Sequence, residues 1–165
     1  MKNSITLSNF IDWIRIFGVS IGYYFSFDAL AADESARAIR LVTLVLGLAL
    51  CATSAFEGLY LSEGSALAKG FDSASPGPNP YHRQSALWFV AGAAMSLVVF
   101  VCFPESSSAN VTYILFVLFF LALSAFNHCY EAVRQGNLSW QNINRPFLFL
   151  VLIAGTIPII RGALL

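Results

Sequence analysis

The chain has 165 residues, of which 58% are hydrophobic and only 11% charged, and its mean hydropathy is +0.71. A soluble domain carries about 25% charged residues, so this composition excludes an ordinary soluble globule and indicates an integral membrane protein. The formal net charge is zero, which gives no indication of a nucleic-acid partner. The length favours a single transmembrane domain over residues 1–165.

Five apolar segments predict an all-α fold, a polytopic membrane bundle of about five transmembrane helices. Each is close to the length of about 20 residues that a helix needs to cross the hydrocarbon layer. The predicted helices cover roughly residues 10–27, 41–61, 85–103, 111–130 and 147–164. A long loop rich in Pro and Gly, residues 63–83, separates the second helix from the third.

The first segment is the least apolar of the five, because Asp12 and Arg15 lie near its start. It could instead be a signal peptide, with Lys2 before it and Ala29–Ala31 as a small-residue cleavage site. The acidic Asp12 and the pair Tyr23–Tyr24 are unusual in such a peptide. We therefore expect a true first helix.

Small residues predict close contacts between helices. Gly18 and Gly22 form a G-x-x-x-G pattern, which lets two helix backbones approach and which we expect to pack within the same chain rather than in a dimer. On the second helix, Gly47, Thr53 and Ser54 share a face with Glu57. Glu57 should therefore face protein, and it needs a partner there because an unpaired charge in a span is costly. The candidate partners are Arg15, Arg83, His128 and Arg145.

The Lys and Arg residues indicate the orientation of the chain. With five alternating spans, the N-terminal side holds Lys2, Arg15, Lys69, Arg83, Arg134 and Arg145, and the other side holds Arg37, Arg40 and Arg161. Because positive residues are enriched on the cytoplasmic side, we predict a cytoplasmic N-terminus in a bacterial inner membrane.

Polar residues converge at the cytoplasmic ends of the predicted helices. Ser124, Asn127, His128 and Glu131 fall on one face of the fourth helix, since successive residues turn by about 100°. These groups predict a polar pocket with the Pro-rich loop as a lid. The predicted lining is Glu57, Gln84, Asn127, His128, Glu131 and Arg145.

The stretch His128–Pro146, "HCYEAVRQGNLSWQNINRP", resembles the signature of a small bacterial multi-span membrane family of unknown function. That signature runs G-H-x-Y-E, then G-N, then N and P before the last span. The matching residues are His128, Tyr130, Glu131, Gly136, Asn137, Asn142 and Pro146. The sequence departs from it at Asn127, where the family has Gly, and by one extra residue before Pro146. The resemblance implies a helical membrane fold and no particular activity.

A divalent metal is one hypothesis for the pocket. His128 and Glu131 are spaced i, i+3 on a helix, so imidazole and carboxylate point the same way, with Glu57 as a third ligand and His82 as a fourth. A Glu and a His could equally relay protons. The alternative is a hydrogen-bonded pair that only fixes helix packing.

Three functions remain open from the sequence. The first is a protein that binds a small polar molecule, a lipid headgroup or an ion. The second is a small metal-dependent membrane enzyme, and the third is a structural or accessory subunit of a homo-oligomer or larger membrane complex. Neither a G-x-S-x-G motif nor a Gly-rich phosphate loop occurs, which argues against an enzyme.

Overall fold

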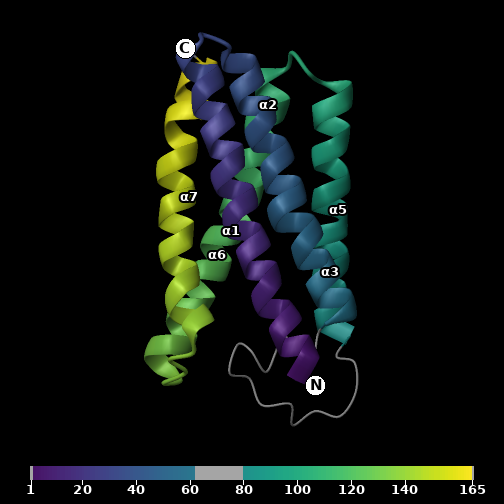
Figure 1. The fold of residues 1–165 in the computed structure, drawn as a ribbon, viewed down its shortest axis with the longest axis vertical. Coiled ribbons are helices and arrows are strands. Elements are labelled where there is room, and N and C mark those ends of the chain that lie inside the picture. Colours follow the sequence, from purple (N-terminus) through teal and green to yellow (C-terminus); the bar gives the residue numbers. More distant parts are fainter. Residues whose placement is uncertain (1, 62–79, 165) are drawn as a thin grey trace.

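The structure is a computed structural model that describes residues 2–61 and 80–164, and these residues form a bundle of long helices without a strand among them (Figure 1). The first helix, α1 (Lys2–Ala31), is continuous. The second rod consists of α2 (Ser35–Val45), a π-helical segment η1 (Leu46–Ala52) and α3 (Thr53–Tyr60), joined end to end. Three further helices follow: α5 (Pro80–Cys102), α6 (Ser107–Arg134) and α7 (Trp140–Leu164). The predicted all-α bundle is confirmed.

Each helix begins before its predicted start. The first begins at residue 2 instead of 10, and α6 continues to Arg134 instead of ending at residue 130. The apolar runs mark only the part of a helix that suits the hydrocarbon layer. Polar residues outside that part keep the helical hydrogen bonds, so the connections are shorter than predicted.

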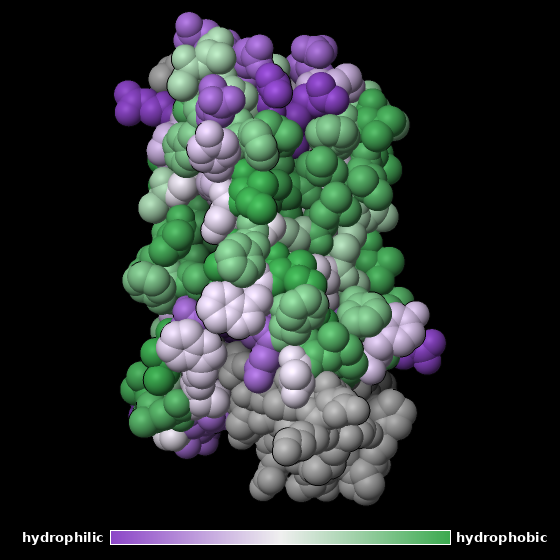
Figure 2. All heavy atoms as spheres, in the orientation of Figure 1, coloured by the Kyte–Doolittle hydropathy of each residue, from purple (hydrophilic) through white to green (hydrophobic). Residues whose placement is uncertain are grey.

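Within residues 2–61 and 80–164, four helices are long and apolar enough to cross a membrane: Ser35–Tyr60, Arg83–Cys102, Ser107–Arg134 and Asn142–Leu164. Large apolar side chains such as Val101, Phe116 and Phe119 are exposed on the outside of the bundle. Figure 2 shows a broad apolar belt on the face in view. A surface of this kind suits lipid and not water. The chain is therefore an integral membrane protein. α1 is not among the four helices that meet the criterion.

The helices alternate in direction along the bundle (Figure 1). One end holds the N-terminus, the end of α3, the start of α5 and the turn between α6 and α7. We call it the N-terminal end. The opposite end holds the α1–α2 turn, the α5–α6 turn and the C-terminus. This is the arrangement of helix ends from which the polar pocket was predicted.

Glycines bring the first two rods into close contact. A Cβ added at Gly22 would lie 2.0 Å from Cγ2 of Val45, and one added at Gly18 would lie 3.0 Å from Cβ of Ala49. No side chain larger than hydrogen fits at Gly22 unless α1 moves away. The G-x-x-x-G pattern thus packs within the chain, as predicted.

The fully buried part of the apolar core lies toward the opposite end of the bundle. Ile39, Val42, Leu46, Ile114 and Ile159 are fully buried there, where α2, α6 and α7 meet. In the same half, the Tyr23 hydroxyl of α1 donates to the carbonyl of Leu152 on α7 at 3.2 Å and pairs with Thr156. Toward the N-terminal end, α1 and α7 diverge (Figure 1).

Candidate ligand cavity

A cavity of about 610 Å³ lies in the N-terminal half of the bundle and is lined by residues from all five rods. Its polar lining includes Asp12, Arg15, Ser54, Asn144 and Arg145. Its apolar lining includes Leu50, Phe89, Val117, Leu121, Leu148 and Phe149. Pockets for small ligands typically measure about 300–1,000 Å³ and combine an apolar wall with a few polar groups. The cavity has the size and lining of a ligand site.

The cavity opens to the surface between α1 and α7. Trp13 of α1 and Trp140 of α7 both line it, and their side chains are also exposed. Paler and polar side chains interrupt the apolar belt where these two helices diverge (Figure 2). Tryptophan favours the interface between the hydrocarbon and the headgroups. The opening therefore lies where lipid headgroups would be found.

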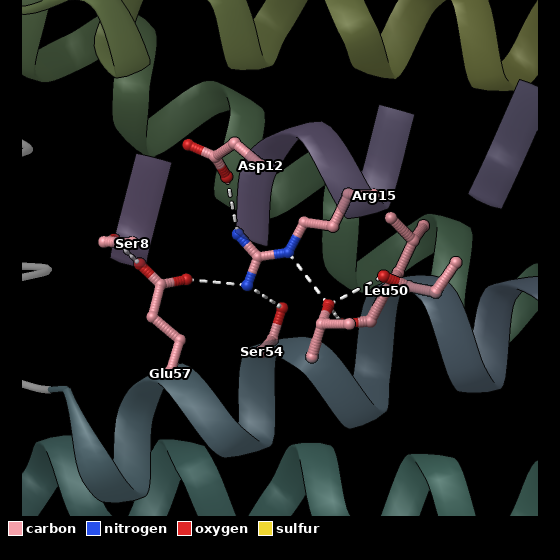
Figure 3. A network of polar contacts seen from close by, with 8 residues as sticks. Ser8, Asp12, Arg15, Leu50, Ser54 and Glu57 are labelled. Carbon is pink, nitrogen blue, oxygen red and sulfur yellow. Dashed lines mark hydrogen bonds and ion pairs between the residues drawn. The ribbon is translucent and has the colours of Figure 1, made fainter. Parts of the chain in front are cut away.

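A network of charges around Arg15 forms one side of the cavity (Figure 3). Its guanidinium donates to Asp12 Oδ1 at 2.7 Å, to Glu57 Oε2 at 2.6 Å and to Ser54 Oγ at 3.2 Å. Its Nε donates to Thr53 Oγ1 at 3.0 Å. The Arg15 side chain is 11% exposed and that of Glu57 is 5% exposed. The network joins α1 to α3 and satisfies both buried charges.

Glu57 faces protein, as the small residues on its helix face predicted. Its second oxygen, Oε1, accepts a hydrogen bond from Ser8 Oγ at 2.5 Å. Of the four candidate partners, the structure shows Arg15 in an ion pair with Glu57. The carboxylate points toward α1 (Figure 3).

His128 is buried on the other side of the bundle, where it helps to join α6 to α7. Its Nδ1 lies 2.7 Å from Oδ1 of Asn142, and Nδ2 of Asn142 donates to the carbonyl of Asn137 at 2.9 Å. Because Asn142 donates through Nδ2, its Oδ1 accepts and His128 Nδ1 donates. Gly136 has φ +65, a left-handed conformation that glycine adopts without strain. We call His128, Asn137 and Asn142 the hairpin clamp.

Several of the residues on which the family resemblance rests have a structural role at this turn. Gly136 makes the turn, and Asn137 Oδ1 accepts from the backbone N–H of Ser139 at 3.3 Å just before α7 begins. His128 and Asn142 then hold the two helices at a fixed angle. A polar residue at a helix end can thus be retained for packing alone.

The structure separates the six residues predicted to line one pocket. Arg145 lines the cavity, Glu57 belongs to the Arg15 network and His128 to the hairpin clamp. Gln84 and Asn127 are exposed, and Glu131 is half-buried. The Pro-rich loop, predicted as a lid, and the side chain of His82 lie outside the described residues.

No group of three or more His, Cys, Asp or Glu side chains that could hold a metal ion occurs in the part of the chain that the structure describes. The expected ligand set of His128, Glu131 and Glu57 is therefore not assembled there. The reason is geometric, since Glu57 bonds across to α1 and His128 bonds across to α7. Helical spacing places residues on one face but does not fix which neighbour that face meets.

Sequence reasoning missed most of the Arg15 network and most of the cavity lining. Ser8, Asp12 and Arg15 are spaced i, i+4, i+7 on α1, so they share a face. Read together, that stripe would have indicated that α1 presents polar groups to the second rod. The apolar lining carries no comparable signal, because its residues are the same types that face lipid.

Comparisons of the chain with protein-family models, with curated proteins and with solved structures give no match.

Proposed function

We propose that the chain is a membrane-embedded binding protein for a lipid-like, amphipathic molecule that occupies the cavity between α1 and α7. The observation that carries the proposal is the cavity itself, which is polar on one side, apolar on the other and open toward the bilayer. A polar molecule alone would leave the wall of Leu121, Leu148 and Phe149 against water. An amphipathic ligand satisfies both sides.

The proposal includes five spans, an N-terminus in the cytoplasm and a bacterial inner membrane as location. α1 supports a fifth span because its Asp12 and Arg15 are paired within the bundle, while Phe10, Phe17, Ile21 and Phe25 are exposed on its outer side. Pairing removes most of the cost of a charge within a span. The orientation follows from the Lys and Arg asymmetry.

Filling the cavity tests the proposal. The Leu121→Trp variant adds a large ring to the cavity wall of α6, and Leu123→Trp places the same ring on an exposed position of that helix. Both variants and the natural chain are purified in a mild nonionic detergent and examined by native mass spectrometry. We expect the natural chain and Leu123→Trp to retain bound lipid, and Leu121→Trp to lose it.

Equal lipid retention by Leu121→Trp and Leu123→Trp would contradict the proposal, because the bound lipid would then lie on the outer surface. Circular dichroism on the same samples shows whether Leu121→Trp remains folded. If it unfolds, the smaller change Ser124→Leu, also in the cavity wall, replaces it and is compared with Leu123→Trp.

A further inference from the structure

Arg145 differs from the other arginine of the cavity in its contacts. Both side chains line the cavity, but Arg15 donates to Asp12, Thr53, Ser54 and Glu57. Arg145 takes part in none of the hydrogen bonds or ion pairs found among the described residues. It is nevertheless half-buried, near the start of α7. Its charge therefore faces the cavity without a partner.

The nearby carboxylates attract the Arg145 guanidinium but form no hydrogen bond or ion pair with it. Asp12 and Glu57 lie close enough to attract Arg145, and Arg15 lies close enough to repel it. Both carboxylates already accept from Arg15, and Glu57 also accepts from Ser8. The cavity lining itself holds two guanidinium groups and one carboxylate. Together with Glu57, which lies just behind the lining, the four groups carry no net charge, but neither carboxylate contacts Arg145 directly.

A largely buried guanidinium that has no hydrogen-bond partner is costly, so a ligand that supplies an oxyanion to Arg145 gains from pairing with it. The planar guanidinium donates two parallel hydrogen bonds to an oxyanion such as a phosphate or a carboxylate. Arg145 can reach such a group through the cavity, because it is one of the residues that line it.

Apolar residues lie directly beside Arg145. Leu148 and Phe149 follow it by three and four positions on α7 and line the cavity with it, as neighbours on one helix face do. Leu121 of α6 and Leu50 of the π-helical segment continue the apolar wall. An anion bound at Arg145 would therefore have an apolar surface next to it, where an acyl chain fits better than water does.

We infer that the cavity selects an anionic lipid, with the phosphate or carboxylate of its headgroup on Arg145 and an acyl chain along Leu121, Leu148 and Phe149. The lipid enters sideways from the bilayer between Trp13 and Trp140. This inference rests on the proposed function and adds the charge of the ligand and the residue that recognises it.

The test compares two lipids with the same acyl chains, anionic phosphatidylglycerol and zwitterionic phosphatidylcholine. Each is titrated into the purified protein in a nonionic detergent, and binding is measured by native mass spectrometry. We expect about tenfold tighter binding of phosphatidylglycerol to the natural chain, because both headgroups carry a phosphate but the choline ammonium of phosphatidylcholine is repelled by Arg145 and offsets the attraction of that phosphate. In Arg145→Gln the preference should fall to about twofold or less, with Arg145→Lys intermediate because it keeps the charge but not the planar fork.

Arg134→Gln is the matched control. Arg134 is an exposed arginine at the same end of the bundle, so its removal lowers general attraction to anionic lipid without touching the cavity. We expect Arg134→Gln to keep the preference of the natural chain. An equal loss in Arg134→Gln and Arg145→Gln would overturn the inference, because it would show attraction by surface charge alone.

Inorganic phosphate separates a lipid headgroup from a free anion. If millimolar phosphate raised the melting temperature as much as saturating phosphatidylglycerol does, a free anion would be the ligand and the inference would fail. We expect phosphate to have a smaller effect, because it leaves the apolar wall uncovered.

Failure of the inference can be told apart from failure of the proposed function. If Arg145→Gln kept the full preference while Leu121→Trp lost all bound lipid, the cavity would still be the lipid site and only the role of Arg145 would be refuted. If Leu121→Trp bound lipid like the natural chain, the proposed function would be refuted as well. Arg145→Gln should fold, since it removes an unpartnered charge, and without lipid it should melt no lower than the natural chain.

Discussion

Arg15 of α1 donates through Nη2 to Oε2 of Glu57 on α3 at 2.6 Å, and both side chains are almost fully buried. The pair joins the first rod to the end of the second, beside the cavity. It also explains how α1 can carry charges within a membrane protein. Each charge in the network has at least one partner of opposite sign.

Removing the carboxylate of Glu57 should destabilise the contact between α1 and α3. We expect Glu57→Leu to lower the stability in detergent by about 1–3 kcal/mol, because buried donors on Ser8 and Arg15 lose their acceptor. Glu57→Gln should cost less, since an amide oxygen still accepts a hydrogen bond. Thermal unfolding followed by circular dichroism measures both.

A double variant provides the control for this prediction. Combining Glu57→Leu with Arg15→Leu should cost less than the sum of the single changes, because neither charge is then left buried alone. Additive losses would mean that Arg15 and Glu57 contribute independently of one another.

The fold was predictable from the sequence, but the cavity was not. Long apolar runs such as residues 111–130 lead directly to helices, and their alternation sorts the helix ends onto two faces of the membrane. The spacing of Asn127, His128 and Glu131, however, places them on one helix face without showing which helix that face contacts. His128 faces α7 and Asn127 is exposed, and this rotation of α6 follows from packing over the whole bundle.

The hairpin clamp should be needed for stability and not for lipid binding. His128→Ala or Asn142→Ala should each cost about 1 kcal/mol, because each removes a buried hydrogen bond, and the double variant should cost little more than either single change. Asn127→Ala, at the neighbouring exposed position, serves as the control and should change stability by less than about 0.5 kcal/mol. Losing bound lipid in His128→Ala while the protein stays folded would contradict this assignment.

The contact between Gly22 and Val45 allows a test of helix packing by compensation. Gly22→Ala should destabilise the chain, because the added Cβ would lie 2.0 Å from a methyl group of Val45. Shortening that side chain with Val45→Ala in the same molecule should restore part of the loss. Melting temperatures in detergent report both effects. A double variant less stable than Gly22→Ala alone would show that the two rods do not approach here.

Cysteine labelling tests the orientation. In a chain whose three native cysteines are replaced, Leu138→Cys in the α6–α7 turn should react with a membrane-impermeant reagent only from the cytoplasm. Glu105→Cys, between α5 and α6, should react only from outside, as the Lys and Arg asymmetry predicts. Both positions are exposed. The reverse labelling pattern would invert the topology, and labelling of both positions from one side would contradict a membrane crossing by α6, the helix between them.

The most direct test of the cavity as a lipid site is an experimental density map of the natural chain in a lipid nanodisc that contains phosphatidylglycerol. We predict continuous elongated density between α1 and α7, with headgroup oxygens about 2.7–3.2 Å from the Arg145 guanidinium, the range of a hydrogen bond. A map in which Arg145 pairs with a protein carboxylate, and in which α1 and α7 close over a filled interior without such density, would contradict the account.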